Sequence, residues 1–241
     1  MKKLLKNEPI LALTALLGMF AGYLRHRMFT TGMDEKGLLI PGHPTAIALW
    51  AVSLVFLVLA FLISRSQNVT APFRAHFPQC KIRGSMSILG GALVCLYGAK
   101  EVLFSQLLVG IFALLAGICM IFTGICRLQG KHPSPMFHCG VCVFCIIRLV
   151  LSFQGWSANP QLQDYVLQLM ACISLMMFAF HRASCDANQI NPKRTAFFSL
   201  CASFFCLASL SDPSLLMLML GAGLWSVGAA PTLEPPAQSE T

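Results

Sequence analysis

Charged residues are scarce in this chain of 241 residues. They make up 11% of it, with only 9 Asp and Glu, whereas hydrophobic residues make up 56%. Soluble domains are about 25% charged, so this composition, with a mean hydropathy of +0.72, excludes an ordinary soluble fold. No polar stretch is long enough for a domain outside a membrane. We therefore expect one membrane domain over residues 1–230 and a short, disordered cytoplasmic tail over residues 231–241.

The sequence also lacks the motifs of the common catalytic sites. It has no HExxH zinc motif, no GxSxG nucleophile elbow, no GxxxxGKS/T phosphate loop and no paired acidic motif. We therefore predict no catalytic residue and no cofactor. The sequence argues against an enzyme but leaves open a membrane enzyme that acts on a lipid or a redox centre. A formal charge of +8 would suggest nucleic acid in a soluble chain. In a membrane chain it reflects basic cytoplasmic loops, so no nucleic-acid partner is expected.

Long hydrophobic runs, in contrast, are abundant and predict an all-α bundle of about eight transmembrane helices. Basic or Pro- and Gly-rich segments separate the runs, and Ser211-Asp212-Pro213 divides the last run into a hairpin. The first, third, seventh and eighth runs are short and could also form half-membrane elements. The predicted helices cover residues 9–24, 45–63, 85–99, 104–125, 137–156, 161–181 and the two halves of 195–229.

Small residues recur at helical spacing in two of these runs. Such stripes let a second helix approach closely, because no side chain separates the two backbones. We therefore predict that both stripes are packing faces. They consist of Thr14, Gly18 and Gly22 in the first run, and of Gly110, Gly117 and Gly124 in the fourth.

Lys and Arg are distributed unequally between alternate loops. Apart from Arg148, 12 of them lie on one predicted side of the membrane and 4 on the other. Because cytoplasmic loops are enriched in Lys and Arg, this asymmetry predicts that both termini are cytoplasmic. None of the 11 cysteines lies in a predicted outer loop, which agrees with this orientation. The outer segments hold only Arg25, Arg27, Lys36 and Lys100.

Arg148 is the most unusual residue, because it lies well inside the predicted helix 137–156. A charge at that depth costs about 3 to more than 10 kcal/mol unless it reaches the surface or pairs. Arg148 lies roughly 12 Å below the outer end of its helix. In the next helix Gln168 falls at a similar depth and Asp164 one turn nearer the surface, and Glu101 also belongs to the outer side. Arg148 therefore has candidate partners in the outer half of the bundle.

Two functional hypotheses follow from Arg148. In the first, Arg148, Asp164, Gln168 and Glu101 form an outer-half polar site that binds or transports a small, anionic solute. In the second, the protein is a non-catalytic membrane interaction, sensor or assembly subunit, and Arg148 is a structural ion pair between helices. The second hypothesis implies partners among other membrane proteins or cytoplasmic subunits.

Histidine and cysteine at the inner ends of two predicted helices form a possible metal site. His138 and Cys142 are four residues apart, as are His181 and Cys185 on the following antiparallel helix. These residue types suit zinc or copper. Buried cysteine and interfacial histidine are common without a metal, however, so we predict no metal site and keep these four residues only as minor candidates.

One string of residues carries a resemblance to known proteins. The predicted outer string TGMDEKGLLIPGHP, residues 31–44, comes directly before a leucine-rich run. It resembles a loop in small multi-spanning proteins of Gram-positive anaerobic bacteria. The resemblance implies a protein of the bacterial cytoplasmic membrane, in contact with the lipid bilayer. It carries no activity and no functional residues with it.

Overall fold

The computed structural model describes residues 8–32, 40, 42–66, 77, 79–104, 106–156, 165–187, 189 and 191–231. Over these residues the protein is all-helical, with eight helices and no strand, as predicted. Five helices are long and apolar enough to cross a membrane, namely α2, α4, α5, α6 and α7, and α9 is a shorter apolar helix. The helices are α1 (Glu8–Thr31), α2 (Pro44–Arg65), α4 (Lys81–Phe104), α5 (Leu107–Gln129), α6 (Pro135–Trp156), α7 (Val166–Asp186), α8 (Pro192–Ala208) and α9 (Leu216–Ala229).

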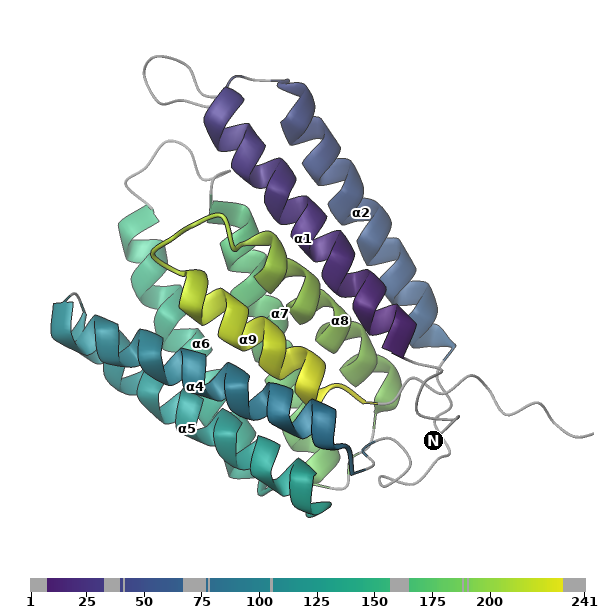
Figure 1. Ribbon diagram of the computed structural model, residues 1–241, viewed down its shortest axis with the longest axis vertical. Coiled ribbons are helices and arrows are strands. Elements are labelled where there is room, and N and C mark those ends of the chain that lie inside the picture. Colours follow the sequence, from purple (N-terminus) through teal and green to yellow (C-terminus); the bar gives the residue numbers. More distant parts are fainter. Residues whose placement is uncertain are drawn as a thin grey trace, which may run out of the picture.

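Six of the helices form a closed ring, in which each packs on the next. The ring runs α4, α5, α6, α7, α8, α9 and back to α4, and α1 and α2 pack together on the α8 side (Figure 1). We call the end at which residues 130–134 join α5 to α6 the α5–α6 end. The opposite end, at which residues 209–215 join α8 to α9, is the α8–α9 end. The sequence predicts that the α5–α6 end is cytoplasmic.

Glycine determines how closely α4 and α5 pack. The predicted stripe of Gly110, Gly117 and Gly124 faces α4, which has its own glycines at the same seven-residue spacing. A methyl group on Gly117 would lie 2.8 Å from the Gly91 carbonyl oxygen, and one on Gly91 would lie 2.7 Å from the Gly117 oxygen. The two backbones are therefore in direct contact, as in small-residue interfaces of membrane helices. The opposed pairs are Gly84 with Gly124, Gly91 with Gly117, and Gly98 with Gly110.

The α1 stripe also packs as predicted. A methyl group on Gly18 would lie 2.9 Å from Leu207 Cβ, and one on Gly22 would lie 2.9 Å from the Leu207 carbonyl oxygen. Both contacts are with α8, so this stripe attaches α1 to the ring. The other face of α4 packs on α9 in a similar way, with Gly90 against Gly221.

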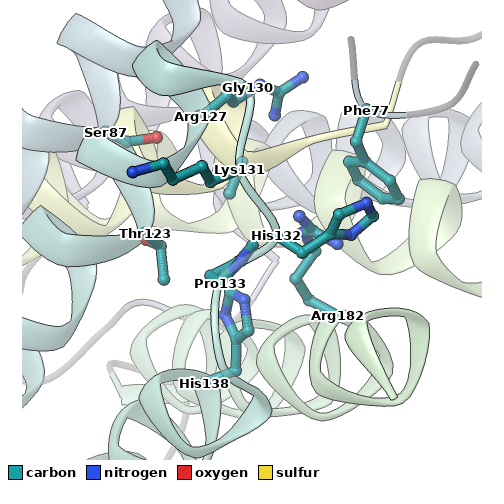
Figure 2. A pocket seen from close by; sticks show the side chains of 11 residues that line it. Phe77, Ser87, Thr123, Arg127, Gly130, Lys131, His132, Pro133, His138 and Arg182 are labelled. Atoms are coloured by element: carbon teal, nitrogen blue, oxygen red, sulfur yellow. The ribbon is translucent and has the colours of Figure 1, made fainter. Parts of the chain in front are cut away.

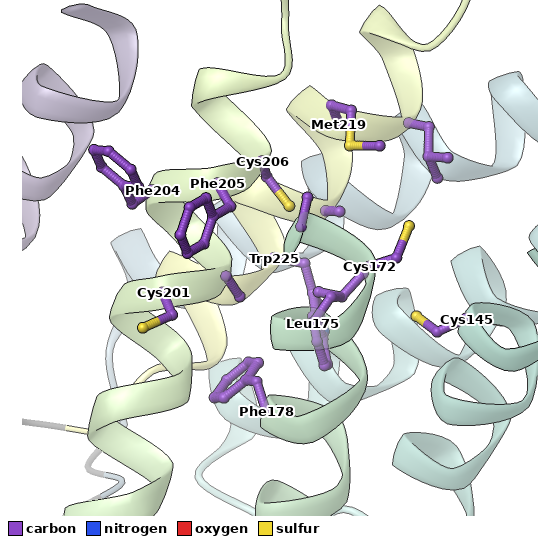
Figure 3. Close-up of a cluster of buried hydrophobic side chains, with 14 of the residues drawn as sticks. Cys145, Cys172, Leu175, Phe178, Cys201, Phe204, Phe205, Cys206, Met219 and Trp225 are labelled. Carbon is purple, nitrogen blue, oxygen red and sulfur yellow. The ribbon is translucent and has the colours of Figure 1, made fainter. Parts of the chain in front are cut away.

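The core lies inside the ring and continues to α1 and α2, and α7 and α8 contribute more of its buried hydrophobic residues than the other helices do (Figure 3). Trp225 is fully buried, and its ring lies 5.2 Å from that of Phe178 and 5.9 Å from that of His138. Its indole Nε1 donates a hydrogen bond of 3.0 Å to Thr123 Oγ1. Trp225 thus fills the space between the apolar core and a polar cluster at the α5–α6 end, and its only polar atom is satisfied.

The helices are longer than the predicted apolar runs at both ends of the bundle. Arg25, Arg27 and Lys100 were expected in outer segments, but they lie inside α1 and α4. The same holds at the α5–α6 end. Arg83, Arg127 and Arg182 were expected in cytoplasmic loops, but they lie inside α4, α5 and α7 and are 3%, 8% and 5% exposed. The expectation failed because it ended each helix where the apolar run ended. An arginine can continue a helix and remain buried when carbonyl or carboxylate oxygens accept its hydrogen bonds.

Candidate functional site

A small cavity lies among the buried polar groups at the α5–α6 end (Figure 2). Its volume is about 30 Å³, which exceeds the roughly 10–15 Å³ that one water molecule needs. Side chains from α4, α5, α6, α7 and α9, from the α5–α6 connection and from Phe77 surround it. We call it the basic cavity; it is lined by Phe77, Ser87, Thr123, Arg127, Gly130, Lys131, His132, Pro133, His138, Arg182 and Ala229.

Asp186 joins two of the cavity's side chains. Its Oδ1 accepts a hydrogen bond of 2.8 Å from Arg182 Nη1, and its Oδ2 lies 2.8 Å from His138 Nε2. The side chains of Asp186 and His138 are fully buried and that of Arg182 is 6% exposed. A buried carboxylate must be paired and hydrogen-bonded to offset its desolvation. The pair on α7 and the histidine on α6 therefore also bind these two helices together.

Arg127 and Arg83 bind the carboxyl end of α9. Arg127 Nη1 donates hydrogen bonds of 2.6 and 2.9 Å to the carbonyl oxygens of Gly228 and Ala230. Arg83 Nη1 lies 3.3 Å from the same Ala230 oxygen. The last carbonyls of a helix have no partner within it and carry partial negative charge, so cations are favourable there. These contacts explain why two arginines are buried at this place in the ring.

Phe77 covers the two cavity arginines. The guanidinium of Arg182 lies 3.6 Å from the centre of its ring, and that of Arg127 lies 5.9 Å away. Both are within the range of cation–π attraction, which is stronger where water is excluded. The aromatic ring favours the cationic groups without neutralising their charge.

Positive charge exceeds negative charge around the basic cavity. Arg127, Lys131 and Arg182 line it, and His138 and His132 add two imidazoles. Among the described residues in contact with this lining, Asp186 supplies the one carboxylate, and that carboxylate bonds Arg182 and His138. Cations that lie close together repel one another, and the repulsion is stronger where water is excluded. The arrangement is therefore favourable to a small anion.

The structure brings some residues of the predicted outer-half site toward one another at the α8–α9 end. The Arg148 guanidinium lies 5.9 Å from the centre of the Tyr97 ring, and Tyr97 interacts electrostatically with both Arg148 and Glu101. Gln168 is 3% exposed, and its Nε2 donates a hydrogen bond of 3.1 Å to Asp212 Oδ2. We call these residues the Arg148 cluster.

Two points separate the Arg148 cluster from the predicted site. Asp164, the predicted partner of Arg148, lies outside the described residues. Within the described part of the chain Arg148 forms no ion pair, and Gln168 bonds Asp212 from the α8–α9 connection. Arg148 is half-buried, so the aromatic face of Tyr97 provides part of its environment.

The four candidate metal ligands do not form a cluster. His138 contacts Asp186, whereas Cys142 Sγ donates to the Met176 carbonyl oxygen at 3.5 Å. Cys185 Sγ lies 3.3 Å from Thr195 Oγ1, and the His181 ring stacks on Phe198. No group of three or more His, Cys, Asp or Glu within the described residues could hold a metal ion. The two pairs that the sequence suggested, His138 with Cys142 and His181 with Cys185, therefore contact separate partners.

Sequence reasoning missed Arg127, Arg182 and Asp186, although the pattern contained a signal for each. Arg127 follows Gly124 at the three-residue step that continues the buried stripe of α5, and Arg182 continues the buried stripe of α7. Arg182 and Asp186 also have the i, i+4 spacing of a helical ion pair. The pattern that could have been recognised is a charged residue at the helical spacing of the buried apolar residues before it.

The fold and its apolar helices define the class of protein: this is an integral membrane protein built as a helical bundle. No family model matches the chain, and no curated protein or solved structure matches it. The geometry of its polar clusters therefore carries the functional argument.

Proposed function

We propose that the protein binds a small anionic solute within its helical bundle, at the basic cavity. The observation that carries this proposal is the charge balance of the cavity, where Arg127, Lys131 and Arg182 face one carboxylate among the described residues. Charge-assisted hydrogen bonds from Arg and Lys are the usual means of holding an anion. Binding would lower the cost of keeping Arg127 and Arg182 out of water.

The size of the cavity limits the class of anion. A volume of about 30 Å³ accepts two or three water-sized groups, since one water needs roughly 10–15 Å³. A halide, nitrate or single carboxylate group fits this limit, whereas a nucleotide or a sugar phosphate does not. The proposal therefore concerns a small inorganic anion or a short carboxylate.

The anion proposal is tested by thermal unfolding of the purified protein in a neutral detergent. Chloride, nitrate, formate and acetate are compared at constant ionic strength with gluconate, a carboxylate too large for the cavity. An anion that binds the folded state stabilises it according to its concentration over Kd. In Lys131→Gln we expect the half-saturating concentration to rise about 3- to 10-fold, because one charged donor is lost.

Lys100→Gln is the matched control. Lys100 is also exposed and lies near the α8–α9 end, where its Nζ is 3.5 Å from the Ser214 carbonyl oxygen. The control should keep the wild-type anion response. If no small anion stabilises the protein more than gluconate does, or if both variants weaken the response equally, anion binding at the cavity is wrong.

The Arg148 cluster supports a more specific form of the proposal, in which the protein transports the anion across the membrane. It gives the bundle a second polar site, and Arg148 lies ten residues after His138 on α6, or roughly 15 Å along the helix. A solute crossing the ring would meet one site near each end. In this proposal Arg148, Gln168 and Glu101, with Asp164, form the outer-half site in a bacterial cytoplasmic membrane, and both termini are cytoplasmic. The core around Trp225 is closed, so passage would require this core to open.

Arg148→Gln separates transport from a structural role. For transport, we expect at least about a 10-fold loss of anion flux into proteoliposomes, with stability within about 1 kcal/mol of wild type. In the alternative, an interaction or assembly subunit, Arg148→Gln melts earlier and flux is absent from both proteins. A structural pair with Asp164 predicts further that Asp164→Asn restores the stability of the Arg148→Gln variant. That restoration would count against the outer-half solute site.

A further inference from the structure

A second, larger hollow lies on the outside of the ring, between the end of α2, the middle of α7 and the start of α8. Its volume is about 610 Å³. The cations Arg65, Lys193 and Arg194 and the apolar side chains of Phe61, Phe197 and Met177 line it. We call it the α2–α8 groove. Neither the basic cavity nor the Arg148 cluster shares a residue with it.

The groove is basic at its mouth and apolar at greater depth. Arg65 is the last residue of α2, and Lys193 and Arg194 lie in the first turn of α8. Phe61 lies four residues before Arg65, and Phe197 lies three residues after Arg194. At 1.5 Å per residue, Phe61 and Phe197 lie roughly 4.5–6 Å farther along their helices toward the middle of the bundle than Arg65 and Arg194. The groove therefore has the polarity of a phospholipid, with a charged head above an apolar chain.

Aromatic contacts give the apolar wall its shape. The rings of Phe61 and Phe197 meet edge to face at 6.5 Å, which connects α2 to α8. His181 stacks on Phe198 at 5.2 Å, which connects α7 to α8. The outward face of α2 is apolar and exposed beside this wall, with Leu62 at 56%. In a bilayer such a face contacts lipid chains, so the groove opens directly to lipid.

From this charge complementarity and polarity we propose that the α2–α8 groove is a binding site for an anionic phospholipid. The phosphate lies between Arg65, Lys193 and Arg194, and one acyl chain runs along Phe61 and Phe197. The described residues that line the groove include no Asp or Glu to compete for the cations. The start of α8 adds the partial positive charge of a helix amino terminus. Basic pockets between membrane helices bind anionic headgroups by this chemistry.

The test compares phosphatidylglycerol with phosphatidylcholine, each titrated into the detergent-purified protein, by thermal unfolding and native mass spectrometry. We expect the wild-type protein to bind phosphatidylglycerol at least 10-fold more tightly than phosphatidylcholine. The triple variant Arg65→Gln, Lys193→Gln, Arg194→Gln should lose about 10- to 100-fold in affinity, because each cation near an anionic headgroup contributes about 1 kcal/mol. Inorganic phosphate at the same concentration should neither stabilise the protein nor compete.

The control triple variant, Arg27→Gln, Lys81→Gln, Lys100→Gln, makes the same change in net charge at exposed positions outside the groove. It should bind phosphatidylglycerol as wild type does. Equal losses in the two triple variants would mean that net charge alone attracts the lipid, and would overturn the proposal. Stabilisation by inorganic phosphate alone, or no preference between the lipids, would overturn it as well. If the groove triple does not fold, Arg194→Gln alone should still weaken lipid binding about 3- to 10-fold.

Discussion

Asp186→Asn is expected to lower the free energy of unfolding by about 3–5 kcal/mol, because it removes one partner of a buried charge pair. Arg182 Nη1 bonds Asp186 Oδ1 at 2.8 Å, and the carboxylate side chain is fully buried. An asparagine keeps the shape but leaves the Arg182 charge without its carboxylate. The variant should also loosen α6 from α7, since His138 loses the same partner. Denaturation in mixed micelles, followed by circular dichroism, measures the change.

Asp212→Asn is the matched control for this prediction. Asp212 is half-buried, and its carboxylate accepts hydrogen bonds from Gln168 and Ser214. The same chemical change should therefore cost only about 1 kcal/mol. A double variant Arg182→Met, Asp186→Leu should recover most of the loss, because well-packed apolar residues often replace a buried ion pair without cost. Equal destabilisation by Asp186→Asn and Asp212→Asn would contradict the charge argument.

Asp186→Asn also bears on the anion proposal. Loss of the carboxylate makes the surroundings of the basic cavity more positive, since Arg127, Lys131 and Arg182 remain. A small anion should then stabilise the variant more than it stabilises wild type, because the bound anion replaces part of the missing charge. The stability loss and the anion response therefore report on two different properties of the cluster.

The helices could be predicted because the membrane imposes a simple rule. A span needs about 20 apolar residues, and the printed sequence contains such runs separated by breaks. The ends were harder to predict. Lys81–Phe104 and Val166–Asp186 extend past the apolar runs into residues such as Arg83 and Arg182. Hydropathy cannot distinguish an arginine in a loop from one that continues a helix and bonds carbonyl oxygens inside it.

The residues of a site come together only when their helices are neighbours, and the sequence of one helix does not show which helices pack against it. The spacing on α6 and α7 was enough to predict that Arg148 and Gln168 lie at similar depth. It could not predict that Asp212, from the α8–α9 connection, bonds Gln168. Nor could it predict that Arg127 of α5 caps α9, about one hundred residues later, through Gly228 and Ala230. Such contacts depend on which helices are neighbours in the closed ring, and the order of the hydrophobic runs along the chain does not determine this.

Gly117→Ala is expected to destabilise the protein by about 1–3 kcal/mol, the usual cost of overpacking a close interface. The new methyl group would lie 2.8 Å from both the Gly91 oxygen and the Cys95 nitrogen, two backbone atoms that a rotamer change cannot move. Gly91→Ala should cost a similar amount, because its methyl group meets the Gly117 oxygen at 2.7 Å. Thermal unfolding in detergent, with α4–α5 separation followed by cysteine accessibility, measures both effects.

Gly223→Ala, in α9, distinguishes this clash from a general effect of glycine. Gly223 is also buried in a helix, but a methyl group there would meet Cys206 Cβ at 3.4 Å, an ordinary contact. The variant should be neutral or more stable by up to about 1 kcal/mol, because alanine favours helix more than glycine does. If Gly117→Ala were equally well tolerated, the α4 and α5 backbones could not be in direct contact. The two helices that carry Arg83 and Arg127 to the carboxyl end of α9 would then be held by some other interface.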